Sequence, residues 1–144
     1  MKKAIVLIFI TCSILYGQGR VNSLDSQLKQ IQSQTNAETI GIVFNPAQVD
    51  LRGEKVTVKT VALPATNGPA LIQNLRAIMN KVDAIYLLKG QNVTTKKLAK
   101  YVVKSASKKN VKVFTNDPKL SGIAGLGLVQ VAGDGSVAVQ YAAE

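Results

Sequence analysis

The order of apolar and polar residues along the chain predicts an alternation of strands and helices. Thr39–Phe44 is a continuous apolar run rich in β-branched side chains, which is typical of a strand buried on both faces. Lys55–Leu63 alternates valines with polar residues less regularly, which indicates a strand at or near the edge of a sheet. Two further short apolar runs, Asp83–Leu88 and Val111–Thr115, predict two more strands.

The clearest helix is predicted over Pro69–Val82, where apolar residues recur at helical spacing. Asn67 or Gly68 can cap this helix, and a proline is well suited to its first turn. Its apolar face consists of Leu71, Ile72, Leu75, Ile78, Met79 and Val82.

Two further helices are predicted, one on each side of this central part. Thr94 or Thr95 caps a helix that runs to about Lys109. The inner face predicted for it consists of Leu98, Tyr101, Val102 and Ser105. Near the N-terminus, Val21–Thr35 has leucine and isoleucine at spacings of four and three residues, which predicts a short amphipathic helix at the edge of the domain.

The last segment changes character and predicts an antiparallel hairpin. Leu126–Val131 and Val137–Tyr141 both alternate, and they flank a Gly-Asp-Gly turn whose glycines are expected to supply positive φ angles. The element order predicts one α/β sandwich with a mostly parallel sheet that ends in this hairpin. The residues expected to be buried most completely are Ile42, Leu75, Ile85 and Val113.

Residues 1–19 are predicted to be a secretory signal peptide. Two lysines precede an apolar run from Ala4 to Ile10, and small residues near Gly19 suit a cleavage site after it. The apolar run is too short to span a bilayer as a helix, and the residue before Cys12 does not suit a lipoprotein. We therefore expect a periplasmic or secreted protein, with a helical segment at 20–37 and one α/β domain at 38–144.

Composition excludes most common catalytic designs. The chain has 144 residues, no histidine and one cysteine, and that cysteine lies in the predicted signal peptide. The processed chain then has no thiol nucleophile and no imidazole base or ligand, so we expect a non-enzymatic protein without a metal or cofactor. The net charge of +10 alone does not indicate a nucleic-acid partner, because export argues against one.

Polar side chains follow three of the predicted strands and form the candidate ligand site. In an open parallel sheet, ligands bind outside the carboxyl ends of the strands. The residues expected there are Asn45, Lys89, Gln91, Asn92, Thr94, Asn116 and Asp117. They suit a small polar ligand, although loops of this kind are also polar because water solvates them.

A stripe of lysines along the third predicted helix forms the candidate partner face. It consists of Lys97, Lys100, Lys104 and Lys108. Such a stripe is typical of a solvated outer face, and it also suits an acidic partner or peripheral contact with anionic headgroups.

The segment VDAIYLLKGQNVTTKKLAKYVVKSASKKNVKVFTNDPKL, together with GIVFNP, resembles one lobe of the periplasmic substrate-binding proteins of ABC transporters. The resemblance covers Glu38 to about Gly127 and implies a three-layer Rossmann-like (flavodoxin-like) fold that binds a ligand. The chain differs from that family because its length allows one lobe, because Pro46–Glu54 is too short for a helical crossover, and because it ends in a hairpin.

LRGEKVTVKTV and VFTNDPKLSGIAGLGLVQVAGDGSVAVQY also resemble YfiR-type proteins. These are small periplasmic regulators that act on a membrane diguanylate cyclase. The redox cysteines of some members and the usual extension after the hairpin are absent here. The two resemblances leave two functions open: binding of a small polar ligand, or contact with an envelope protein, with a homodimer as a further possibility.

Overall fold

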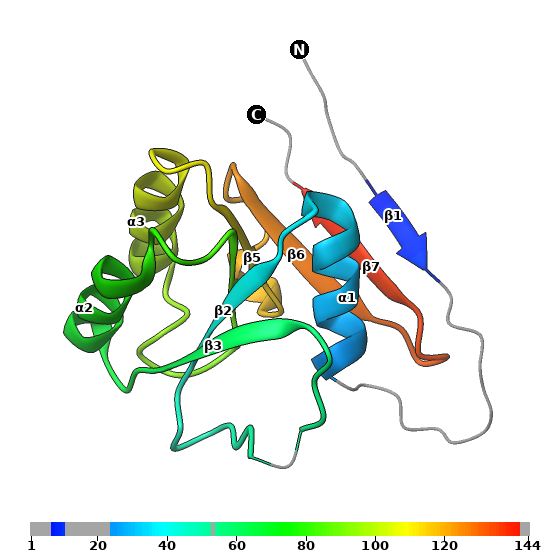
Figure 1. Ribbon diagram of the computed structural model, residues 1–144, viewed down its shortest axis with the longest axis horizontal. Helices are drawn as coiled ribbons and strands as arrows, with labels where there is room; N and C mark the ends of the chain where they lie inside the picture. The colour runs from blue at the N-terminus through cyan, green and yellow to red at the C-terminus, as the bar shows by residue number, and fades with distance from the viewer. Residues whose placement is uncertain (1–6, 11–23, 53, 142–144) are drawn as a thin grey trace.

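The chain forms one seven-stranded sheet with helices on both faces (Figure 1). The computed structural model describes residues 7–10, 24–52 and 54–141. The strands are β1 (Leu7–Ile10), β2 (Thr39–Phe44), β3 (Lys59–Pro64), β4 (Ala84–Leu87), β5 (Lys112–Thr115), β6 (Leu126–Val131) and β7 (Val137–Tyr141). The helices are α1 (Leu24–Thr35), α2 (Gly68–Ile78), α3 (Lys96–Ser107) and a 3₁₀ turn, η1 (Pro118–Leu120).

The strand order is β1-β7-β6-β5-β4-β2-β3. The five strands from β3 to β6 pair in parallel, and β7 joins β6 antiparallel. Within the parallel part, the first strand lies between the second and the third, which is the flavodoxin-like order. The predicted three-layer α/β fold with a terminal hairpin is therefore confirmed.

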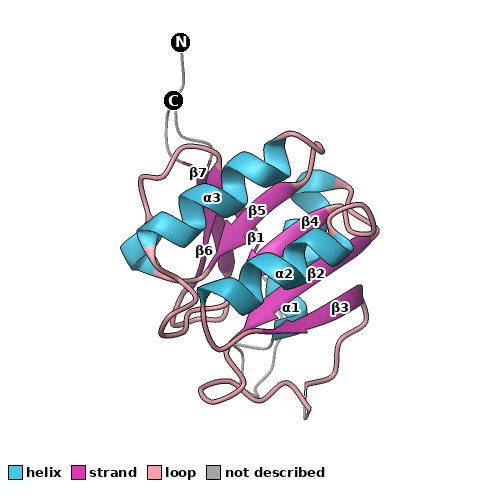
Figure 2. Ribbon diagram, turned by 90° about the vertical axis from the view of Figure 1, so that its left-hand side faces the viewer, coloured by secondary structure: helices cyan, strands magenta, loops and turns pink. Residues whose placement is uncertain are grey.

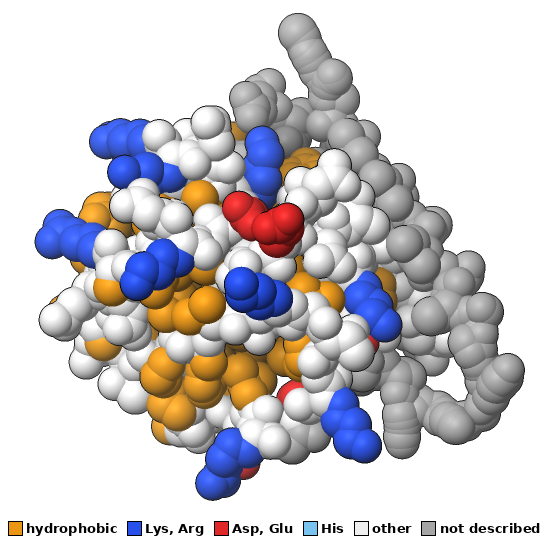
Figure 3. All heavy atoms as spheres, in the orientation of Figure 1, with side chains coloured by type: hydrophobic (Ala, Val, Ile, Leu, Met, Phe, Trp, Pro, Cys, Tyr) orange, Lys and Arg blue, Asp and Glu red, His pale blue; other side chains and the backbone are white. Residues whose placement is uncertain are grey.

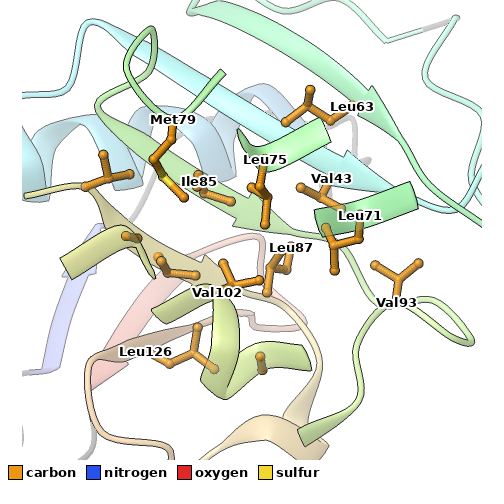
Figure 4. Packing of buried hydrophobic residues seen from close by; sticks show 14 of the residues in the cluster. Val43, Leu63, Leu71, Leu75, Met79, Ile85, Leu87, Val93, Val102 and Leu126 are labelled. Atoms are coloured by element: carbon orange, nitrogen blue, oxygen red, sulfur yellow. The ribbon is translucent and has the colours of Figure 1, made fainter. Parts of the chain in front are cut away.

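One face of the sheet is covered by α2 and α3, which lie side by side over it in Figure 2. Their buried residues meet the apolar residues of β2, β4 and β5 in one cluster, part of which is shown in Figure 4. Asn67 caps α2 by accepting a hydrogen bond from the Ala70 N–H at 2.9 Å, as its side chain predicts. The expected core residues Ile42, Leu75, Ile85 and Val113 are all at most 2% exposed.

The opposite face is covered by α1, which corrects the expectation that this helix lies at the domain edge. Leu28 and Ile31 are fully buried in a second core cluster. The reason is the connection from β2 to β3: among its described residues, 45–52 and 54–58, there is no helix. A parallel connection normally supplies a helix to cover the sheet, and here α1, which precedes β2, covers that face instead.

Four local predictions are wrong in detail. Tyr101 is exposed, and Ala99, Val102 and Ala106 form the buried side of α3. Small alanines let the helix approach the sheet closely, and the larger tyrosine faces outward.

In the terminal turn, among the described residues, only the second of the two glycines, Gly135, has a positive φ, 90°. The Ala132 N–H donates to the Ser136 carbonyl, so the turn is a three-residue loop with a bulge.

The helix α2 ends at Ile78, four residues before its predicted end, and Met79 and Val82 are buried in the turn that follows it. The strand β3 begins at Lys59, four residues after its predicted start, and it is one of the two edge strands of the described sheet, in agreement with its predicted position.

The predicted signal peptide is described only in part. Its residues 7–10 form β1, which pairs with β7 at one end of the sheet (Figure 1). The predicted cleavage site after Gly19 and Cys12 both lie outside the described residues. Within the described part of the chain, no helix has the length and hydrophobicity needed to cross a membrane.

Candidate functional site

The candidate site is built on the carboxyl ends of β2, β4 and β5, which are neighbours in the sheet. After β4, the chain turns at Gly90 and Asn92 before the Thr95 hydroxyl accepts a hydrogen bond from the Leu98 N–H and caps α3. Asn92 has a φ of 62°, a left-handed conformation that asparagine tolerates better than most residues. A Cβ atom at position 90 would lie 3.1 Å from the Asn45 Cβ, so glycine allows the loops after β2 and β4 to approach closely.

A cavity of about 760 Å³ opens at these strand ends. Five of the seven predicted ligand-binding residues line it: Lys89, Gln91, Asn92, Thr94 and Asp117. Four further residues line the cavity and were not predicted to bind a ligand: Gln48, Gly90, Thr95 and Lys119. Gln48 and Lys119 come from loops after β2 and β5, and their position after a strand end was the signal that could have identified them.

The other two predicted residues, Asn45 and Asn116, do not line the cavity and instead hold its wall in place. Asn45 is buried, and its amide donates to the Gln91 carbonyl at 3.1 Å. Asn116 accepts a hydrogen bond from the Lys89 N–H at 2.7 Å. Gln48 adds a third link, because its Oε1 accepts from the Gln91 N–H at 2.5 Å. The loop after β4 is therefore tied to the loops on both sides of it.

Thr94 and Asp117 form a buried polar pair at the wall of the cavity. The Thr94 hydroxyl lies 2.7 Å from Asp117 Oδ2, to which it donates, and 3.0 Å from the Gly90 carbonyl. Asp117 is 2% exposed, and its other oxygen accepts from the Lys119 N–H at 3.0 Å. Since both carboxylate oxygens have donors, this aspartate can stay buried and fix η1 against the start of α3.

The charges around the cavity are mixed. The ammonium groups of Lys89 and Lys119 belong to exposed residues, whereas the Asp117 carboxylate is buried. Exposed amides at Gln91 and Asn92 add both donors and acceptors. This set suits hydrogen bonding to a small polar molecule, with the lysines favouring one that carries an anionic group. Among the described residues, no group of three or more His, Cys, Asp or Glu side chains is placed to hold a metal ion.

The predicted partner face lies on the outer side of α3. Lys97, Lys100, Lys104 and Lys108 are all exposed, and basic side chains stand out over the α2 and α3 side of the molecule in Figure 3. Neither of the two ion pairs among the described residues includes one of these four lysines. Lys100 and Lys104, with Lys96, line a second hollow of about 480 Å³ against the loop from Ser121 to Ala124.

No protein-family model and no curated protein matches this chain. A solved structure is similar to it: a conserved domain protein from Vibrio cholerae O1 biovar El Tor, with 19% sequence identity and a TM-score of 0.58. The match covers 79% of this chain and 42% of that one, so the chain spans less than half of its length. At this identity the likeness supports the fold alone.

Proposed function

We propose that this protein is an exported, non-enzymatic binding domain that holds a small polar ligand at the carboxyl ends of β2, β4 and β5. The observation that carries this proposal is the cavity lined by Lys89, Gln91, Asn92, Thr94 and Asp117. These residues follow the carboxyl ends of neighbouring parallel strands, and they line one hollow. Its volume of about 760 Å³ is within the range of small-molecule sites.

The structure of the loops supports ligand binding over simple chain turning. A loop that only turns the chain needs no buried carboxylate and no hydrogen bonds to both neighbouring loops. Here Asp117 is buried and satisfied, and the turn at Gly90 is tied to Asn45 and Asn116 on its two sides. A rigid wall of this kind reduces the entropy lost when a ligand binds.

The proposal is tested with Lys89→Ala combined with Gln91→Ala, two exposed lining residues whose main-chain bonds to the neighbouring loops remain. The matched control is Lys109→Ala with Gln73→Ala, which removes the same side-chain types from exposed positions just after α3 and on α2. A thermal-shift screen with sugars, amino acids, small carboxylates and inorganic phosphate identifies a ligand, and calorimetry then measures its affinity. We expect the lining variant to lose at least about tenfold in affinity, or about 1.4 kcal/mol, and the control to bind like wild type.

Equal binding by both variants would place the ligand outside this cavity. Asn116→Ala is not a suitable test, because loss of the bond from the Lys89 N–H would move the cavity wall as well.

The second candidate is a YfiR-like regulator that contacts a membrane signalling protein such as a diguanylate cyclase. The observation in its favour is the row of exposed lysines on α3 and the hollow that Lys96, Lys100 and Lys104 form with Ser121 to Ala124. Reversing the charge of Lys97, Lys100 and Lys104 to Glu should then break partner capture without changing ligand binding. The lining variant described above should have the opposite effect, so the pair separates the two functions.

A further inference from the structure

The end of the sheet formed by β7 and β1 is the feature that neither candidate function uses. In the full chain, β1 pairs with β7 in an antiparallel register that sets Ile8 opposite Val139 and Ile10 opposite Val137. Yet β1 lies in the predicted signal peptide. Cleavage after Gly19 would remove it and leave β7 as an unpaired edge, with its N–H and C=O groups open to another strand.

We propose that in the processed chain this edge pairs with the β7 edge of a second copy, which takes the place of β1 and makes a two-fold symmetric dimer with one continuous sheet. The inference rests on the proposed export and cleavage, and it is independent of the ligand site. An extended segment already lies on this edge in the full chain, so the edge is straight and regular enough to accept a strand.

The direction in which each residue of β7 points its main-chain N–H and C=O groups supports a symmetric pair. The Ala132 N–H donates to the Ser136 carbonyl at 2.8 Å, so alternate residues after Ser136 direct their main-chain groups toward β6. Ala138 and Gln140 therefore pair with β6, and Val137, Val139 and Tyr141 direct theirs outward. An antiparallel pair of two β7 strands centred on Val139 satisfies all three outward residues in both copies.

The two edges of the sheet differ in their protection against such pairing. The opposite edge strand, β3, carries the exposed Lys59 at one end and Pro64 at the other, and lysine and proline are common devices against edge pairing. The β7 sequence, VAVQY, contains no charged residue and no proline. A second copy fits this edge because identical strands pair antiparallel across a two-fold axis.

The first test keeps the full chain and frees its edge. Ile8 faces Val139, so Ile8→Pro removes a main-chain N–H from the β1–β7 ladder. Sedimentation or light scattering at about 100 μM, where a dimer with a micromolar Kd is mostly formed, should give the mass of one chain for wild type and of two chains for Ile8→Pro. Monomeric Ile8→Pro with native circular dichroism would overturn the proposal.

The second test uses the processed protein, recovered after export with its N-terminus confirmed by mass spectrometry. In the symmetric pair, Ala138 lies opposite Gln140 of the second copy. Ala138→Lys with Gln140→Lys sets like charges opposite each other and should give monomers, whereas Ala138→Lys with Gln140→Glu sets opposite charges together and should remain dimeric. Retention of residues 1–19, a monomeric processed wild type, or identical masses for the two variants would each contradict the proposal. Ligand binding in the thermal-shift screen is scored separately, so failure of one proposal is distinguishable from failure of the other.

Discussion

The two faces of the sheet are covered in different ways. On one face, α2 and α3 pack side by side, and the buried residues of these two helices are all apolar. On the other face, α1 packs alone, and polar side chains are buried beside the apolar ones: Gln27 and Gln30 are 8% and 1% exposed. The Tyr86 hydroxyl reaches from β4 across this layer and donates to Gln27 Oε1.

This difference shows how a lone helix is fixed in position. Two neighbouring helices restrict each other by packing, whereas a single helix on a sheet can slide or rotate over apolar side chains. A buried hydrogen bond between Tyr86 and Gln27 favours one position, and Asp25 fixes the start of α1 by accepting from the Thr57 N–H at 2.8 Å. Burial raises the pKa of Asp25, but the bonds from Thr57 and Lys29 outweigh it and leave that pKa below its usual value.

The largest effects are expected from cavities in the two cores. Leu75→Ala on α2 should lower the free energy of unfolding by about 2–5 kcal/mol, because Leu75 is 2% exposed between α2 and the sheet. Leu28→Ala on α1 should fall at the lower end of that range, since a helix without a neighbour can shift to fill the space. Urea melts measure both, and a loss under about 1 kcal/mol for Leu75→Ala would contradict the packing of α2.

Removing the hydrogen bond across the α1 layer should have a smaller effect. Tyr86→Phe keeps the aromatic ring and deletes only the hydroxyl that donates to Gln27. We expect a loss of about 1–3 kcal/mol at neutral pH, because the acceptor stays buried. The exposed Tyr101→Phe is the control, and an equal loss there would show that the Tyr86 bond contributes nothing specific.

The same tyrosine predicts a dependence on alkaline pH. Burial raises the pKa of Tyr86 well above its ordinary value of 10.0, so the folded chain keeps a proton that the unfolded chain loses. Below pH 10 both states keep this proton, and the free energy of unfolding does not depend on it. Above pH 10 the free energy of unfolding falls by about 1.4 kcal/mol per pH unit. Burial also raises the pKa of Tyr141, to about 12, so Tyr86→Phe should make the decline shallower without abolishing it. Melts from pH 9 to 11 measure the slope, and identical slopes would rule this explanation out.

The smallest effect is expected at Gln30. Within the described part of the chain, neither its Nε2 nor its Oε1 has a hydrogen-bond partner, although the residue is almost fully buried. Gln30→Leu has a similar volume and removes the cost of burying an amide, so stability should stay within about 1 kcal/mol of wild type or rise. A loss of more than about 2 kcal/mol would mean that the amide has a partner in solution, such as a bound water.

The face with two helices could be predicted from sequence because its signals are local. The caps at Asn67 and Thr95 and the helical spacing of Leu71 and Leu75 are all contained in one segment. The place of α1 could not be predicted in this way. It depends on the connection between β2 and β3, whose described residues include no helix. The residues of α1 do not themselves show which part of the sheet lacks a cover.

In the candidate site, too, some residues could be predicted from the sequence and others could not. Gln91, Asn92 and Thr94 could be selected because they directly follow a strand. The supporting role of Asn45 and Asn116 could not, since it depends on which loops lie side by side and on the partners of each amide. The position of Tyr101 could not be predicted either, because its aromatic ring favours burial, whereas the side chain is exposed and the nearby Arg76 and Ser105 lower the pKa of its hydroxyl.

The contact between α1 and β7 has a consequence for the order in which the chain folds. It joins the first helix to the last strand of the described sheet, so the two halves of this layer are separated by almost the whole sequence. As the chain emerges N-terminus first, β2 to β5 and the helices α2 and α3 are complete before the β6–β7 hairpin. The apolar side of α1 therefore stays without its full cover until β7 has emerged, so this layer closes later than the one beneath α2 and α3.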